Sequence, residues 1–372
     1  MKLPFILRRL SFPRLFNREL LRYLCPGFLV TVGFIDPGNW ATNIAGGAQF
    51  GYGLLWVITL STLMLVLFQH MAAHLGIVTG ECLAESCRRW FPAWANVLFG
   101  VTVMVACVAT ALAEFLGAAI GLNMLFGIPV GLAAVVAMIG VLGLLVFQKY
   151  DRIEHIIIAF VSIIGFCYLA QLLIVDPDWG AALPAAVIPS LPDGSIFVAM
   201  GMLGAVVMPH NIYLHSEVIQ KRNWTATDPV RKRQLLRYEF LDTLTAMGAG
   251  WVINSAMVIV AAAVFFSNGV VVSDIAQAAD TLRPLAGNTA RLLFAIAFLC
   301  AGLSSSITVC LAGGTVFTGF LGHEIDPKKW WYRAGILLTA VPAVLLIQVL
   351  TDAFQALVWS QVVLSIQLPL TI

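Results

Sequence analysis

The chain has 372 residues, of which 60% are hydrophobic and only 11% are charged. An ordinary soluble domain carries roughly 25% charged residues, so this composition excludes a soluble enzyme. With 21 basic and 19 acidic residues the formal net charge is +2, which gives no reason to expect a nucleic acid as a partner. Because a membrane-spanning helix takes about 20 apolar residues, the chain is predicted to be an all-α integral membrane protein with several spans.

Ten apolar blocks, separated by short polar or Gly/Pro-containing links, are each long enough to cross a membrane. In chain order they are expected at residues 24–50, 52–78, 94–121, 129–148, 153–174, 195–219, 239–266, 290–320, 332–350 and 354–372. We interpret residues 1–372 as one transmembrane transporter domain, in which residues 1–23 form an arm before the first span.

The basic residues fall on one side of the predicted membrane. If the N-terminal arm is placed in the cytoplasm and the spans alternate in direction, 19 of the 21 Lys and Arg residues lie on the cytoplasmic side. The opposite links carry acids, including Asp176, Asp178 and Asp193. This is the asymmetry of the positive-inside rule. The sequence therefore predicts a multi-pass protein of the plasma membrane with both ends in the cytoplasm.

Two of the predicted spans are interrupted at mid-depth. Residues 36–39 (Asp-Pro-Gly-Asn) interrupt the first span and residues 208–211 (Met-Pro-His-Asn) interrupt the sixth. We assign Pro37, Gly38 and Pro209 as the residues that break the helices, because proline removes a helical hydrogen bond. The two breaks lie five spans apart in helices of opposite direction, which predicts inverted repeats at 24–174 and 195–372 with the substrate between them.

Both breaks offer groups that bind cations. An unwound segment frees backbone carbonyls, and the first break adds the Asp36 carboxylate and the Asn39 amide oxygen, which are hard ligands. The second break adds the Met208 thioether, close to the Ala205 carbonyl one helical turn earlier. Late first-row ions tolerate sulfur, whereas Mg²⁺ and Ca²⁺ do not use it, so the donor set predicts ions of the Mn²⁺ or Fe²⁺ class. The alternatives are helix capping by the polar residues and core packing by Met208.

Other ionisable residues also lie at membrane depth. His210 and His215 follow the second break and Glu114 lies within the third span. Such side chains relay protons in pumps and transporters; the alternative is a hydrogen-bonded brace between helices. His70 and His74 are one helical turn apart, a spacing that can chelate metal, but the stretch lacks the Glu of a metalloprotease motif. We therefore do not expect a metal site at these two histidines.

At residues 36–39 and 208–211 the chain resembles the Nramp family of divalent metal transporters, and the likeness extends over nearly its whole length. Further family-like stretches are residues 43–49, 75–80, 112–114, 212–216 and 360–365. The resemblance implies a LeuT-type fold with a five-plus-five inverted repeat and uptake of Mn²⁺ and Fe²⁺, usually with protons. It also implies metal ligands at the first four of the following positions, with the fifth approaching in some conformations: Asp36, Asn39, Ala205, Met208 and Gln361.

The chain also departs from the family pattern. Ala111 stands where the family usually has Asp, and Leu303 stands where it has Gln. The basic residue typical of the ninth span, several residues before Pro342, is not matched, because Arg333 lies nearer the start of that helix. The Asp and the basic residue belong to the proton route that the resemblance implies. We therefore expect metal movement to be coupled only loosely to protons. Family members commonly continue to eleven or twelve spans, whereas this sequence stops at Ile372.

Three functions are compatible with these observations. The leading one is a secondary transporter that imports Mn²⁺ or Fe²⁺ by alternating access. The second is a relative that selects Mg²⁺ or another hard ion, and the third is a metal-sensing membrane protein that has lost transport. The expected partners are divalent metal ions, protons and membrane lipid, with no resident cofactor. An enzyme is not expected, because the sequence contains no nucleophile–base pair or cofactor motif.

Overall fold

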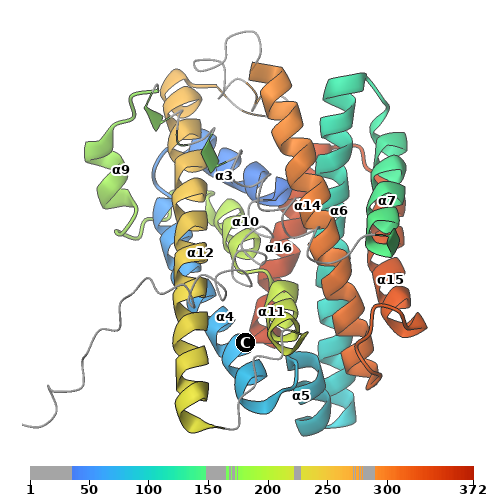
Figure 1. The fold of residues 1–372 in the computed structure, drawn as a ribbon. Coiled ribbons are helices and arrows are strands. Elements are labelled where there is room, and N and C mark those ends of the chain that lie inside the picture. Colours follow the sequence, from blue (N-terminus) through green and yellow to red (C-terminus); the bar gives the residue numbers. More distant parts are fainter. Residues whose placement is uncertain are drawn as a thin grey trace, which may run out of the picture.

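The computed structural model describes residues 36–147, 175–221, 228–270 and 290–372, together with isolated positions within 165–173 and 272–279. The predicted arm at 1–23, residues 24–35 of the first predicted span and most of the span at 153–174 lie outside the described residues. The described part is a bundle of helices in which the two predicted broken spans lie near the centre (Figure 1).

The helices have the order that the apolar blocks predict. Among the described residues, seven helical segments are long and apolar enough to cross a membrane, and α7 is a shorter apolar helix. The helices of the predicted spans are α3 (Pro37–Phe50), α4 (Leu55–Thr79), α6 (Ala93–Phe126), α7 (Val130–Phe147), α10 (Ile196–Val206), α11 (Pro209–Lys221), α12 (Pro229–Val264), α14 (Ala290–Leu321), α15 (Trp330–Ile347) and α16 (Ala353–Thr371).

Some predicted boundaries are wrong. The seventh span was expected from residue 239, but α12 begins at Pro229. Asp228 caps this helix by accepting hydrogen bonds from two backbone N–H groups, and proline is favoured in the first turn, so the helix extends beyond its apolar part. Two short helices, α5 (Leu83–Trp90) and α9 (Trp179–Ala185), lie in the links between the predicted spans. A hydropathy pattern reports membrane depth rather than helix ends.

Helix contacts follow the symmetry of two inverted repeats. In such a repeat each span corresponds to the span five positions later. Spans one and seven pack together as α3 and α12, and the equivalent spans six and two pack together as α10, α11 and α4. Spans three and eight, α6 and α14, pack against each other. This arrangement brings α3, α10 and α16 together around the two helix breaks.

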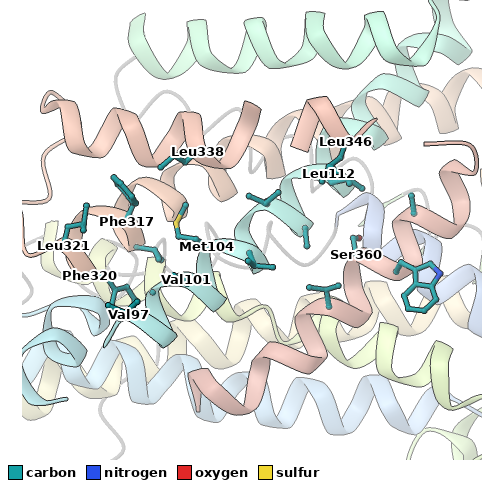
Figure 2. Close-up of a pocket in the computed structure, with 18 of the residues that line it drawn as sticks. Val97, Val101, Met104, Leu112, Phe317, Phe320, Leu321, Leu338, Leu346 and Ser360 are labelled. Carbon is teal, nitrogen blue, oxygen red and sulfur yellow. The ribbon is translucent and has the colours of Figure 1, made fainter. Parts of the chain in front are cut away.

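A cavity of about 710 Å³ lies between α6, α14, α15 and α16 (Figure 2). Its lining is apolar, as Figure 2 shows for Met104, Phe317 and Leu346, apart from the polar residues Asn96 and Ser360. The predicted metal ligands do not line it. Because a metal ion requires several polar donor atoms, this cavity is not the candidate metal site.

Candidate metal-binding site

The first break holds Asp36 at the N-terminus of α3. Asp36 has an extended backbone (φ −101°, ψ 166°), and its Oδ1 atom accepts a hydrogen bond from the Asn39 N–H at 2.7 Å. Pro37 occupies the first helical position, where its missing N–H costs nothing. The side chains of Asp36 and Asn39 are fully buried. The break therefore fixes a carboxylate and an amide next to each other in the interior.

The second break lies between α10, which ends at Val206, and α11, which begins at Pro209. In a continuous helix the Ala205 carbonyl would accept a hydrogen bond from the N–H of residue 209. Proline has no N–H, so this carbonyl is released at the position that the sequence predicted. Met208 lies in the non-helical link with its side chain fully buried.

The two breaks meet in the centre of the bundle. The Asn39 Nδ2 atom donates a hydrogen bond to the released Ala205 carbonyl at 3.4 Å. Gln361 on α16 lies against the first break, since a Cβ atom added to Gly38 would be only 1.9 Å from Gln361 Nε2. Gly38 is therefore needed for this close approach as well as for the break. The predicted ligands thus come from α3, the second break and α16.

Several oxygen atoms around the breaks have no hydrogen-bond partner. They include Asp36 Oδ2, Gln361 Oε1 and Asn211 Oδ1, all of which are buried. Buried polar atoms are normally paired, and unpaired oxygens of this kind can be satisfied by a cation. Asn211 was noted in the sequence only as part of the break, yet its Nδ2 atom lies 3.4 Å from Met208 Sδ. Among the described residues no three His, Cys, Asp or Glu side chains form a metal-binding group.

Glu114, one of the predicted relay residues, lies beside the first break. It is fully buried on α6, and its carboxyl group interacts with that of Asp36. Gly117, one turn further along α6, allows this approach, because a Cβ atom there would lie 2.1 Å from Pro37 Cγ. The structure therefore brings an acid on α6 to the acid of the candidate metal site.

The two predicted relay histidines face different helices. His210 Nδ1 lies 3.4 Å from Thr110 Oγ1 on α6, whereas His215 Nδ1 lies 2.9 Å from Gln69 Oε1 on α4. The two histidines are five residues apart, so their side chains leave α11 in directions about 140° apart around the helix axis. This is why they contact different helices. The prediction of a relay is untested, but these contacts do not form a single line along α11.

The three residues that depart from the family pattern lie on the helices that the sequence predicted for them. Ala111 is buried on α6, one turn before Glu114. Leu303 is half-buried on α14. Arg333 is exposed in the first turn of α15, where its Nε atom donates to the Pro327 carbonyl at 3.4 Å. Arg333 is therefore held at the end of its helix rather than at the depth of the site.

Several side chains that support the site were not predicted from the sequence. Asn43 Nδ2 on α3 donates to Asn39 Oδ1 at 3.3 Å and to Asn254 Oδ1 on α12 at 2.8 Å. The Trp40 ring packs against Phe294 and Phe298 of α14, with centroids 5.2 and 5.3 Å apart. The two asparagines could have been noticed as polar residues within apolar blocks. Their hydrogen-bond partners could not be assigned from one sequence.

Comparison with known proteins identifies the family. The model of the Nramp family, described as natural resistance-associated macrophage protein-like, matches residues 27–372. The chain belongs to the Nramp family. Together with its long apolar helices, this membership makes it an integral membrane protein.

Two curated relatives of this Nramp protein carry the name divalent metal cation transporter MntH. The relative from Caldanaerobacter subterraneus subsp. tengcongensis is 42% identical over 358 residues, which cover 95% of this chain and 84% of the relative. The relative from Brucella suis biovar 1 is 41% identical over 366 residues, which cover 95% of this chain and 79% of the relative.

Solved structures give the same fold. The manganese transporter of Eremococcus coleocola, in complex with an aromatic bis-isothiourea substituted compound, superposes with a TM-score of 0.80 at 32% identity and covers 96% of this chain and 78% of its own. Mhp1, a nucleobase-cation-symport-1 family transporter, reaches a TM-score of 0.64 at 16% identity and covers 89% of this chain. The expected LeuT-type helical fold is thereby confirmed for this Nramp protein.

Proposed function

We propose that this Nramp protein is a secondary transporter that imports Mn²⁺ and Fe²⁺ by alternating access. The observation that carries the proposal is the meeting of the two helix breaks, where the Asn39 amide reaches the released Ala205 carbonyl at 3.4 Å. Substrate sites at the interface of two inverted repeats can be opened to either side in turn when one repeat rocks against the other. Relatives named as divalent metal cation and manganese transporters support the choice of cargo.

The donor set favours transition metals over hard ions. We assign Asp36, Asn39, the Ala205 carbonyl and Met208 as ligands, with Gln361 as a further ligand in some conformations. Asp36 supplies the charge that any divalent ion needs. The Met208 thioether adds affinity for Mn²⁺ and Fe²⁺ but little for Mg²⁺, so it argues against a Mg²⁺-selective relative.

Protons accompany the metal only loosely in our proposal. Glu114 on α6 interacts with Asp36, so Glu114 can pass a proton to or from the candidate metal site. Ala111 and the peripheral Arg333 interrupt the branch through spans three and nine, so acid outside should stimulate uptake weakly and without a fixed stoichiometry. We place the protein in the plasma membrane, in contact with lipid and with its N-terminus in the cytoplasm, because the basic residues concentrate on one side.

Uptake into reconstituted vesicles tests the proposal. Mn²⁺, Fe²⁺, Mg²⁺ and Ca²⁺ are offered in competition, with and without a pH gradient, to the unchanged protein and to the Asp36→Asn variant. Asn retains the helix cap and removes only the charge. We expect Mn²⁺ and Fe²⁺ to enter through the unchanged protein and no metal to enter through the variant. Equal uptake by the two proteins, or preferred uptake of Mg²⁺, would contradict the proposal.

A further inference from the structure

A second polar cluster lies away from the candidate metal site, between α4, α11 and α12. His70 Nδ1 on α4 is 2.5 Å from Glu239 Oε2 on α12. The other carboxylate oxygen, Glu239 Oε1, accepts a hydrogen bond from Thr243 Oγ1 at 2.7 Å. Gln69, next to His70 in the chain, contacts His215 of α11 at 2.9 Å. We refer to these five residues as the inner cluster.

The His70–Glu239 pair lies within the membrane-spanning helices. His70 is nine residues from the end of α4 and Glu239 is ten residues from the start of α12, which corresponds to roughly 15 Å at 1.5 Å per residue. The Glu239 side chain is 1% exposed, whereas that of His70 is 27% exposed. The first ten residues of α12 are mostly polar and precede its apolar part, so the pair lies near one edge of the apolar region, where an enclosed ionised carboxylate is costly unless it is paired. One partner is thus enclosed, and the other has access to the surroundings.

Holding α4 against α12 does not require a titratable pair. Closer to the other end of the same two helices, Trp251 Nε1 donates to Thr59 Oγ1 at 3.0 Å, and a neutral hydrogen bond serves there. A buried ion pair contributes little net stability over well-packed neutral groups, because its desolvation offsets its attraction. A contact that only joined the two helices would not need ionisable groups. The His70–Glu239 pair has them and can therefore bind and release a proton.

We propose that the inner cluster is the cytoplasmic exit for protons that enter with the metal, with the His70–Glu239 pair as the terminal acceptor. The inference rests on the proposed function, since it presupposes transport. His215 interacts electrostatically with both members of the pair. Its Nε2 atom and the Nε2 atom of Gln69 are buried without a hydrogen-bond partner, which leaves polar atoms for a bridging water to bond.

The proton is conserved at each step. The N–H bond at Nε2 of protonated His215 breaks, and the proton passes through water to the free ring nitrogen of His70, leaving His215 neutral. The ionised Glu239 stabilises the protonated His70 at 2.5 Å. His70 then releases the proton to cytoplasmic water through its exposed edge and is neutral again. Gln69 does not titrate; it orients His215.

Several other titratable groups lie on the described elements that pack against the pair. Helices α3, α9 and α10, which also pack against α4 or α12, contain no titratable side chain. Glu217 on α11 is paired with Lys221, and Glu85 on α5 accepts from Gln220. Among the described residues, the remaining titratable side chains on the packed elements are His74 on α4, His210 and Tyr213 on α11, Cys87, Arg88 and Arg89 on α5, and Arg231, Lys232, Arg233, Arg237, Tyr238 and Asp242 on α12. His74 is exposed, and its ring centroid lies 5.9 Å from that of His70.

The Glu239→Gln variant tests the assignment. Gln still hydrogen-bonds to His70 and Thr243 but does not stabilise a protonated His70. Metal and proton entry are measured separately in vesicles, using Mn²⁺ and a pH-sensitive dye trapped inside, at a fixed membrane potential. We expect proton entry to fall about tenfold or more, as for loss of a positioned proton-transfer group, while Mn²⁺ uptake changes by less than about twofold. The matched control, His74→Gln, should retain both fluxes.

The outcomes separate the inference from the proposed function. If the unchanged protein carries Mn²⁺ and the proton flux through Glu239→Gln equals that through the unchanged protein, the inner cluster is not the proton exit. A joint fall of Mn²⁺ uptake, proton entry and melting temperature in Glu239→Gln would show a structural pair and would also overturn the inference. If the unchanged protein carries Mn²⁺ without protons, the inference fails and the proposed function stands. If it carries no metal at all, both fail.

Discussion

The two helix breaks contribute different ligand groups to the candidate metal site. In the first, one carboxylate oxygen of Asp36 accepts a hydrogen bond from the Asn39 N–H, which fixes the position of the side chain. The other carboxylate oxygen is buried without a hydrogen-bond partner and can therefore bind a cation. In the second, Pro209 releases the Ala205 carbonyl and Met208 supplies a sulfur atom. In our proposal the first break therefore provides the charge that binds the metal ion and the second provides preference among ions.

Removing the charge of the first break should have the largest effect. We expect Asp36→Ala to abolish Mn²⁺ binding and transport, because Asp36 is the only carboxylate within the two breaks and Glu114 lies on a different helix. The variant also loses a helix cap worth about 1 kcal/mol. Calorimetry with Mn²⁺ measures the binding. Asp36→Asn, which keeps the cap, should bind no better; unchanged affinity in either variant would place the site elsewhere.

Filling the space between the first break and α16 should have the next largest effect. A Cβ atom at residue 38 would lie 1.9 Å from Gln361 Nε2, so Gly38→Ala should displace Gln361 or the break itself. Misplacing a ligand by about 1 Å can reduce activity by roughly a hundredfold, and we expect a loss of tenfold to a hundredfold in Mn²⁺ uptake. The measurement is initial uptake at saturating metal.

A glycine in open space provides the control for that variant. Among the described residues, nothing lies within 4 Å of a Cβ atom added to Gly248 on α12. Gly248→Ala should leave uptake unchanged and, because alanine favours helix by up to about 1 kcal/mol over glycine, should not lower the melting temperature. Normal uptake by Gly38→Ala would show that the contact with Gln361 has no role in transport.

Changing the second break should have the smallest effect on Mn²⁺ and a larger effect on selectivity. Met208→Ala removes the thioether but leaves the carboxylate, amide and carbonyl oxygens, which suit hard ions. We expect Mn²⁺ uptake to fall only a few-fold, while Ca²⁺ and Mg²⁺ become effective competitors. Competition uptake in vesicles measures this. If the unchanged protein already carries Ca²⁺ as readily as Mn²⁺, Met208 acts in packing alone.

The sequence predicted the breaks well because their signals are local. A proline with polar neighbours inside an apolar run disturbs a helix wherever the rest of the chain goes, and the Ala205 carbonyl lies one turn before Pro209 by helix geometry alone. The spans were located for the same reason. The start of α12 was placed ten residues late, since its first turns are polar and stabilised by the Asp228 cap.

Contacts between distant segments could not be predicted from one sequence. Gly38 and Gln361 are more than 300 residues apart, and only the packing of α3 against α16 shows why glycine is needed. His70 was considered together with His74, its neighbour on α4, whereas its partner is Glu239 on α12. Hydropathy identifies a buried charge as unusual, but the helix that faces it follows from the tertiary arrangement.

The central claim is that the two breaks share one metal ion. Anomalous diffraction from crystals soaked in Mn²⁺ tests this most directly, because it locates the metal independently of transport. We expect one strong peak in contact with the Asp36 carboxylate, the Ala205 carbonyl and the Met208 sulfur, and no peak there in Asp36→Asn. A peak near His70 and His74, or one that persists in Asp36→Asn, would contradict the account.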